Sequence, residues 1–239
     1  MDQPILAINS LNSGYGKFQV VFDVSFNVYR NEIFLIVGPN GSGKSTLLKS
    51  IFGLTTIYSG SISYMGRDVT KLPPYVKARI GIAYLPQTDN VFSELTVREN
   101  LMMATYTLKE SEARDRVEEV LKIYPMLRNR LDYKAKSLSG GERQMLALAM
   151  TLVRRPSIIM LDEPTVNLAP VVAKDLLKKI SMLRDEMGIT VILVEQNARA
   201  ALEMGDRALL MVSGRVAYEG PARSLLQDAE LGRRYLGLR

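Results

Sequence analysis

The chain has 239 residues, of which 47% are hydrophobic and 23% are charged, a composition typical of globular proteins with a substantial core. It contains neither cysteine nor histidine, which excludes disulfides, thiolate metal sites, cysteine nucleophiles and histidine general bases, and leaves carboxylates, lysines, hydroxyls and backbone groups to carry any chemistry. The net charge of +6 suits a nucleotide or an acidic membrane surface, and because the basic residues are scattered along the chain, we expect no nucleic-acid partner.

The N-terminal part of the chain favours short strands joined by turns. Residues 5–29 and 60–69 carry this pattern, and we expect turns at Gly14, Gly16 and Gly66. The sequence thus predicts an antiparallel sheet packed beside a larger core. No apolar run reaches the roughly 20 residues that span a bilayer, so we expect any association with a membrane to go through partner proteins.

Beyond the N-terminal part, short apolar runs alternate with amphipathic stretches. The apolar runs, which are typical of buried strands, are residues 33–37, 80–85, 158–161, 190–194 and 208–212. The amphipathic stretches, which are typical of helices, are residues 44–52, 142–153 and 171–187. This alternation predicts an α/β fold with a mostly parallel sheet.

Almost everything over residues 94–153 favours helix. We therefore expect a single domain over residues 1–239, in which residues 1–90 and 155–239 form the core and residues 91–154 form a helical subdomain.

The C-terminal tail is predicted to begin with a hairpin around Ser213 and Gly214 and to end in a helix that carries Leu225, Leu231 and Tyr235. Packing of these side chains against the core is one interpretation of the tail, and a regulatory or partner contact is the other.

A glycine-rich segment lies directly after the first apolar run of the core and directly before an amphipathic stretch, and it matches the P-loop pattern G-x-x-x-x-G-K-[ST]. Its glycines let the backbone turn so that successive N–H groups point inward, and the following helix adds the positive end of its dipole. We therefore expect this segment to bind a polyphosphate. Its residues are Gly38, Pro39, Asn40, Gly41, Ser42, Gly43, Lys44, Ser45 and Thr46.

Individual residues of this segment have expected roles. Lys44 should reach the β- and γ-phosphates as a point charge, and the Ser45 hydroxyl should bind Mg2+ that bridges them, while Thr46 helps to hold the α- or β-phosphate. Farther along, an apolar strand ends in two carboxylates, Asp162 and Glu163, and resembles a Walker B segment. There Asp162 would hold Mg2+, and Glu163 would orient or deprotonate the attacking water.

The segment LSGGERQ, residues 138–144, lies between the P-loop and these two carboxylates. It resembles the signature motif of the ATP-binding-cassette (ABC) family, and with the P-loop and the LDEP segment in this order the resemblance covers nearly the whole chain. The resemblance implies a P-loop NTPase core of the RecA-like type, with an antiparallel β subdomain and a helical subdomain. It also implies that the protein binds ATP and Mg2+ and hydrolyses ATP.

The start of the signature segment is a second candidate anion site. Ser139, Gly140 and Gly141 open a predicted helix whose free N–H groups can face a phosphate. The resemblance implies that two subunits pack head to tail, so that Ser139 and Gly141 contact the γ-phosphate on the P-loop of the other subunit. Hydrolysis would then remove a contact between the subunits.

Further positions follow from the resemblance. Tyr15 matches the aromatic residue that stacks on adenine, although a tyrosine in the core or in a turn fits the pattern too. Gln87 matches the glutamine that meets Mg2+ and water and links the core to the helical part, with a solvated loop glutamine as the alternative. Phe92 and Leu95 would border the groove that receives a membrane subunit, or else pack inside the helical part.

Two positions depart from the family pattern. Gln196 stands where the family usually has a histidine, and its amide can donate to phosphate and accept from water but cannot carry a charge. We therefore expect hydrolysis without an imidazole titration. Ala169 stands where many members have an aspartate, which removes one hydrogen bond between the two subunits.

The segments LAP at residues 168–170 and VEQN at residues 194–197 resemble the branch of the family that serves branched-chain amino-acid importers, in particular the shorter of its two cassettes. The resemblance implies ATP or ADP as ligand, a second cassette, permease subunits and, indirectly, a substrate-binding protein, at the cytoplasmic face of the inner membrane. The alternatives are another cargo, a non-transport ABC ATPase, and a regulatory protein that does not hydrolyse ATP, against which the presence of Glu163 argues.

Overall fold

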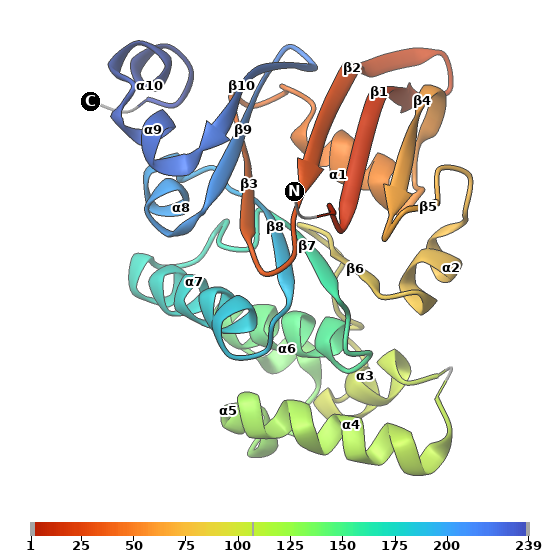
Figure 1. Ribbon diagram of the computed structural model, residues 1–239. Helices are drawn as coiled ribbons and strands as arrows, with labels where there is room; N and C mark the ends of the chain where they lie inside the picture. The colour runs from red at the N-terminus through yellow and green to blue at the C-terminus, as the bar shows by residue number, and fades with distance from the viewer. Residues whose placement is uncertain (1–2, 107, 238–239) are drawn as a thin grey trace.

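The computed structural model describes residues 3–106 and 108–237, in which two sheets are surrounded by helices (Figure 1). The larger sheet has six strands in the order β10-β9-β3-β8-β7-β6, and all neighbours are parallel except β10 and β9. Its strands are β3 (Ile33–Val37), β6 (Ile82–Leu85), β7 (Ile158–Asp162), β8 (Thr190–Val194), β9 (Arg207–Val212) and β10 (Arg215–Pro221). The predicted α/β fold with a mostly parallel sheet is confirmed.

The smaller sheet has four antiparallel strands in the order β2-β1-β4-β5. They are β1 (Leu6–Tyr15), β2 (Phe18–Val28), β4 (Thr56–Tyr64) and β5 (Arg67–Asp68). The turns predicted at Gly16 and Gly66 are confirmed, since both residues have positive φ between paired strands. The turn predicted at Gly14 is wrong, because Gly14 pairs with Gln19 inside the hairpin. A Cβ there would lie 2.0 Å from the carbonyl oxygen of Phe18, so glycine is needed for close strand approach.

Helices cover both faces of the larger sheet, and the three predicted amphipathic stretches are confirmed as α1, α6 and α7 with small shifts at their ends. The helices are α1 (Lys44–Phe52), α2 (Pro74–Arg79), α3 (Val97–Ala104), α4 (Glu110–Ile123), α5 (Pro125–Arg128), α6 (Gly140–Leu152), α7 (Pro170–Asp185), α8 (Ala198–Met204), α9 (Ala222–Gln227) and α10 (Ala229–Tyr235), with a 3-10 turn at Ala135–Ser137. Residues 94–153 are thus predominantly helical, as predicted.

The strand predicted over residues 80–85 begins only at Ile82, because the preceding residues belong to α2, a short helix that the sequence pattern did not reveal. Ile80 caps α2, and Gly81, with φ of 104°, turns the chain into β6.

The hairpin predicted at Ser213 and Gly214 is confirmed, and both residues have positive φ, as a two-residue hairpin turn requires. The prediction of a single terminal helix is wrong. The chain forms α9 and α10 instead, because the Asp228 side chain accepts from the backbone N–H groups of Glu230 and Leu231 and so starts a new helix. Leu225, Leu231 and Tyr235 pack against the core, which supports the packing interpretation of the tail.

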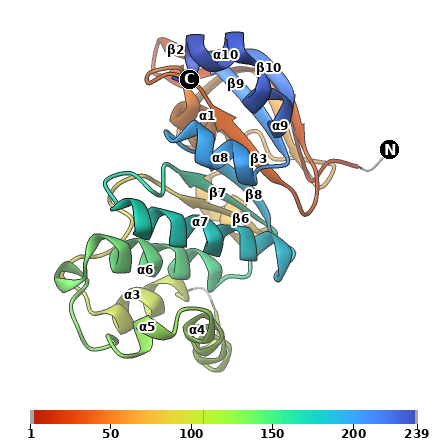
Figure 2. The same cartoon turned by 90° about the vertical axis from the view of Figure 1, so that its left-hand side faces the viewer.

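The larger sheet separates two apolar cores. Along β3, Phe34 and Ile36 face the core that contains α1 and the antiparallel sheet, whereas Leu35 and Val37 face the core that contains α6, α7, α8 and α9. Figure 2 shows α3, α4 and α5 beyond α6, on the side away from the antiparallel sheet. Because parallel strands run the same way, the loops after β3, β6, β7 and β8 meet at one edge of the sheet.

A buried cation holds the C-terminal end of α1. Lys77 of α2 is 0% exposed, and its Nζ donates to the carbonyl oxygen of Ile51, in the last turn of α1, at 2.8 Å. This oxygen lies at the negative end of the α1 dipole, where a cation is stabilising. Burial nevertheless lowers the pKa of Lys77 to about 8, against an opposing effect of Asp68.

Membrane association was expected to need partners. Within the ranges that the structure describes, no helix is both long enough and apolar enough to cross a membrane.

Candidate functional site

The P-loop connects the end of β3 to the start of α1, and its glycines adopt conformations that other residues rarely reach. Gly38, Gly41 and Gly43 have φ of 149°, 77° and 97°. A Cβ on Gly38 would lie 2.1 Å from the carbonyl oxygen of Met211 in β9, so a side chain cannot be accommodated there without moving the backbone. These turns fold the segment over the N-terminal end of α1, where backbone N–H groups are available to an anion.

Lys44 lies across this loop. It is 4% exposed, and its Nζ donates to the carbonyl oxygens of Gly38 and Pro39, both at 2.9 Å. Burial lowers the pKa of Lys44, while the nearby carboxylates Glu163 and Asp162 raise it. The lysine is therefore held inside the loop, where its charge can meet a bound phosphate.

The polar groups of the loop fit an anionic ligand. The hydroxyl of Ser42 is buried and has no hydrogen-bond partner among the described residues, and Gly43, the N-cap of α1, provides no side-chain cap. A cavity of about 360 Å³ opens over this helix start. Its lining residues are Val20, Asn40, Gly41, Gly43, Lys44, Ser45, Thr46, Gln87, Glu163 and Gln196. Three other loops thus bring side chains to the same cavity.

Asp162 ends β7 beside the P-loop. Its Oδ1 accepts from the hydroxyl of Ser45 at 2.8 Å, and its Oδ2 accepts from the hydroxyl of Tyr84 at 3.1 Å. Tyr84 reaches Asp162 because β6 lies next to β7 in parallel register. Burial, together with Asp162, raises the pKa of Tyr84, so this phenol stays protonated and donates. Sequence reasoning missed Tyr84, whose only signal was a polar atom near the end of a strand.

Glu163 follows Asp162 and is the point at which three loops meet. Its backbone has φ of 49°, and its N–H donates to the carbonyl oxygen of Val194 at 2.9 Å. Its Oε2 accepts from Nε2 of Gln87 at 2.9 Å and from Nε2 of Gln196 at 2.7 Å. Both amides therefore hold one carboxylate oxygen at the rim of the P-loop cavity.

The neighbouring oxygens of Ser45 and Asp162 are suited to Mg2+, which prefers oxygen ligands and usually keeps several waters or substrate phosphates. No three acidic side chains gather as a metal site in the described part of the chain. The third expected metal ligand, Gln87, lies with its amide on Glu163. The assignment of Mg2+ ligands stays a prediction.

The signature segment forms a different kind of helix start. Ser139 is the N-cap of α6, where its hydroxyl accepts from the N–H of Glu142 while its own N–H donates to the Glu142 carboxylate. A Cβ on Gly141 would lie 2.5 Å from Cγ1 of Val172 in α7. Ser139, Gly140 and Gly141 do not line the P-loop cavity. Their contact with nucleotide across two subunits therefore stays a prediction.

The other predicted positions lie at the surface or at an element end. Tyr15 ends β1 and is 45% exposed, as a stacking platform must be, but it does not line the P-loop cavity. Phe92 is 51% exposed, whereas Leu95 is half-buried. Ala169 is the N-cap of α7 and provides no side-chain cap. The roles predicted for these residues are not decided by their positions.

Comparison with known proteins agrees with this geometry. Residues 21–166 match the family described as ABC transporter. This chain belongs to the ABC transporter family. It is an ATP-binding cassette with the ATPase fold of that family, which accounts for the phosphate-binding loop, the two carboxylates and the signature helix.

Several curated relatives match almost end to end. The chain is 50% identical to the probable branched-chain amino acid transport ATP-binding protein LivF of Archaeoglobus fulgidus, over 95% of this chain and 97% of that protein. It is 39% identical to the high-affinity branched-chain amino acid transport ATP-binding protein BraG of Pseudomonas aeruginosa, over 98% and 100%. It is 35% identical to the lipopolysaccharide export system ATP-binding protein LptB of Haemophilus influenzae, over 98% and 97%.

Solved structures show the same fold. An ATP-binding cassette of an ABC transporter in its ADP conformation superposes with a TM-score of 0.87 at 27% identity, covering 97% of this chain and 98% of the other. A dimeric cassette in a post-hydrolysis state, bound to ADP and Pi, gives a TM-score of 0.79 at 26% identity, covering 91% and 99%.

Proposed function

We propose that this cassette hydrolyses ATP to power the import of branched-chain amino acids. Hydrolysis is supported by the position of Glu163, whose carboxylate is held by Gln87 and Gln196 at the rim of the P-loop cavity. The cargo is supported by the likeness to two proteins named for branched-chain amino acid transport, each matched over nearly its whole length.

Each of the site residues has a role in hydrolysis that follows from its position. The P-loop N–H groups and Lys44 hold the phosphates of ATP, and Glu163 orients the attacking water and accepts its proton. Ser45 and Asp162 would hold Mg2+, which would withdraw charge from the phosphates when bound. Gln196 keeps the Glu163 carboxylate in place with a neutral amide, so hydrolysis has no step that depends on an imidazole.

The active form of the cassette is a dimer. Ser139, Gly140 and Gly141 begin α6 at the surface, so they can reach a nucleotide held by a partner subunit. A solved neighbour with ADP and Pi is dimeric, which supports the same arrangement here. The partner is a second copy or a related cassette, and Tyr15 stacks on the adenine of the nucleotide that its own P-loop holds.

The cassette acts at the cytoplasmic face of the inner membrane, through permease subunits that receive amino acids from a substrate-binding protein. Residues 91–154 form the helical subdomain, and the exposed ring of Phe92 lies at its border, where a permease helix can bury it. Gln87 links this border to Glu163, so binding of the permease and hydrolysis are connected through one loop.

A second cargo is favoured by one observation. The chain is also 35% identical to a lipopolysaccharide export ATP-binding protein over nearly its full length, so the same ATPase can serve unrelated cargo. Co-purification of the membrane partner and its identification by mass spectrometry distinguish import of branched-chain amino acids from transport of another cargo. A permease for another cargo would overturn the import assignment and leave the ATPase assignment intact.

The test of the hydrolytic site is Glu163→Gln, which keeps the size of the side chain but removes the base. We expect ATP hydrolysis to fall at least about 100-fold while ATP binding is kept. ATP should then trap a dimer that size-exclusion chromatography detects. Glu203→Gln, an exposed acid of α8, is the matched control and should hydrolyse ATP at the wild-type rate. Unchanged turnover in Glu163→Gln would remove the role assigned to this residue.

A further inference from the structure

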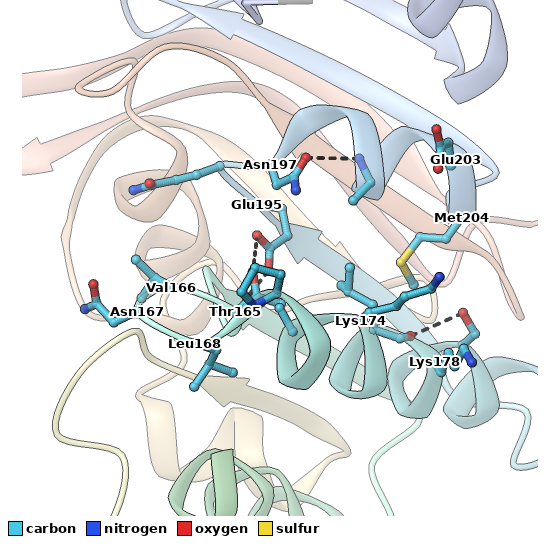
Figure 3. A pocket seen from close by; sticks show the side chains of 16 residues that line it. Thr165, Val166, Asn167, Leu168, Lys174, Lys178, Glu195, Asn197, Glu203 and Met204 are labelled. Atoms are coloured by element: carbon cyan, nitrogen blue, oxygen red, sulfur yellow. Dashed lines mark hydrogen bonds between the residues drawn. The ribbon is translucent and has the colours of Figure 1, made fainter. Parts of the chain in front are cut away.

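A buried carboxylate lies beside the proposed site and has no part in the mechanism above. Glu195 follows β8 directly and is 2% exposed. Both of its oxygens accept from one residue, Oε1 from the N–H of Thr165 at 3.1 Å and Oε2 from the hydroxyl of Thr165 at 2.8 Å (Figure 3). Burial raises the pKa of Glu195, and the bonds from Thr165 oppose that rise. Because a buried carboxylate is costly without partners, the pair stabilises one geometry of the two loops.

The loop that Thr165 belongs to carries two residues in a strained backbone conformation. Glu163 has φ of 49° and Asn167 has φ of 60°, in the left-handed region that costs free energy for residues with a side chain. Such conformations persist where the surrounding structure fixes them. Val166 and Leu168 donate within the loop, to the carbonyl oxygens of Glu163 and Thr165, so these bonds do not anchor the loop to the sheet.

Packing gives the loop little support on its outer side. A cleft of about 770 Å³ opens between α7 and α8, and Thr165, Val166 and Leu168 form part of its wall (Figure 3). Glu195 lies on the inner side of the same cleft. Besides the packing of Leu168 against the core, polar contacts with the end of β8 hold the position of the loop.

The contacts between the two loops form a closed ring. The N–H of Glu163 donates to the carbonyl oxygen of Val194, and the N–H and hydroxyl of Thr165 donate to the Glu195 carboxylate. The side-chain amide of Gln196 donates to the carboxylate of Glu163. The residues that take part on the β8 side, Val194, Glu195 and Gln196, are consecutive in the chain. A displacement of the backbone at Glu195 therefore also displaces the next residue, whose amide holds the proposed base.

We infer that Glu195 is a positioning residue for hydrolysis, which fixes the loop after β7 through Thr165 and thereby sets the orientation of the Glu163 carboxylate. The inference rests on the role proposed for Glu163. Glu195 does not line the P-loop cavity, so its loss should change the rate of the chemical step and leave the P-loop contacts to ATP unchanged.

The experiment compares variants of the purified full-length protein by steady-state ATP hydrolysis, binding of a fluorescent ATP analogue and thermal unfolding. Glu195→Ala removes both contacts, and we expect kcat to fall about 10- to 100-fold with nucleotide affinity within about threefold of wild type. Glu195→Gln can accept from the Thr165 N–H and donate to its hydroxyl, so its kcat should stay within about threefold of wild type. Thr165→Val, which removes only the hydroxyl contact, should lower kcat about 3- to 10-fold.

The matched control is another buried carboxylate. Glu32 is 8% exposed, accepts from the N–H of Tyr29 at 2.7 Å and lies at the opposite end of β3 from the P-loop. Glu32→Ala should lower the melting temperature as Glu195→Ala does, but leave kcat unchanged. Glu163→Gln is measured in the same series. If it still hydrolyses ATP, the proposed role of Glu163 fails, whereas an inactive Glu163→Gln beside a fully active Glu195→Ala overturns only the present inference.

Two results overturn the inference directly. One is a kcat of Glu195→Ala within twofold of wild type. The other is a fall of kcat and nucleotide affinity together, in proportion to the loss of thermal stability, as a purely structural role would produce. If Glu195→Ala does not fold, Thr165→Val decides, and an unchanged kcat in that variant overturns the inference.

Discussion

The chain contains two helix starts that are candidate phosphate sites, and they use their backbone donors differently. At the start of α1, Gly43 has φ of 97° and provides no side-chain cap, and Ser42, Gly43 and Lys44 are buried. At the start of α6, Ser139 and Glu142 form a capping box at the surface. The first start leaves its N–H groups to a ligand that the same loop encloses. The second already satisfies two donors with its own side chains.

The difference indicates what each site needs in order to bind phosphate. The P-loop has a buried lysine, a cavity and the carboxylate of Asp162 beside Ser45, all within a single chain. The α6 start keeps the first-turn N–H groups of Gly140 and Gly141 without a side-chain cap, and these residues do not line the P-loop cavity of their own chain. The prediction that follows is that this helix start meets a phosphate held by another subunit.

The largest expected effect is on the first site. Lys44→Ala removes the cation that lies across the P-loop, and nucleotide affinity should fall at least about 100-fold. Isothermal titration calorimetry with Mg-ATP measures this affinity. Lys49→Ala, which removes a lysine from the other end of the same helix, should bind nucleotide within about twofold of wild type. Comparable affinity in the two variants would contradict the assignment of Lys44.

A change at the start of α6 should leave nucleotide binding by the single subunit intact and impair the dimer instead. Ser139→Asp keeps an N-cap acceptor, so its stability should match wild type, but it places a carboxylate where a phosphate is expected. We expect ATP binding by the single subunit within about twofold of wild type, and ATP-dependent dimer formation and hydrolysis reduced about tenfold or more. Analytical ultracentrifugation and a phosphate-release assay measure the two quantities.

Ser137→Asp is the control for that variant. Ser137 precedes α6 at the surface, and its hydroxyl donates to the carbonyl oxygen of Lys134. It should dimerise and hydrolyse ATP as wild type does. If Ser139→Asp lost nucleotide binding in the isolated subunit, the proposed division of the two sites between subunits would be wrong.

The smallest effect concerns the far end of α1. The pKa of Lys77 is lowered from 10.5 to about 8 by burial, so between these pH values the unfolded chain binds a proton that the folded chain has released. The free energy of unfolding should therefore rise with pH across this window, because the cost of burying the charged lysine is relieved. Lys77→Met lacks this contribution, so its unfolding free energy should rise less from pH 8 to pH 10.

Urea unfolding followed by far-ultraviolet circular dichroism measures this difference. Lys71→Met, which removes an exposed lysine just before α2, should keep the wild-type pH dependence. Identical slopes for wild type and Lys77→Met would show that Lys77 is not the group responsible.

Much of the fold could be predicted because its signals are local. The strands of the parallel sheet are short apolar runs, and the P-loop pattern specifies strand, loop and helix together. The errors also have local causes. Gly14 was predicted as a turn because a glycine permits one, whereas here it allows two strands to approach. The break between α9 and α10 depends on the Asp228 side chain, which apolar periodicity does not reveal.

The missed parts of the site depend on which strands become neighbours. Tyr84 meets Asp162 because β6 lies beside β7, and Thr165 meets Glu195 because β7 lies beside β8. Nothing in the sequence near Tyr84 or Thr165 indicates these partners, because strand order is decided by packing of the whole sheet. Asp162 and Glu163 were found because their motif is contiguous in the chain.

The close approach of Gly141 to Val172 has a mechanical consequence. A methyl group of Val172 occupies the space that a side chain at position 141 would need, so the first turns of α6 and α7 are in direct contact. Helix α7 begins where the loop carrying Glu163 ends. In a close-packed interior even a small displacement of one helix must be taken up by the other. A displacement of the signature helix would therefore be transmitted through this one helix contact to the loop that carries Glu163.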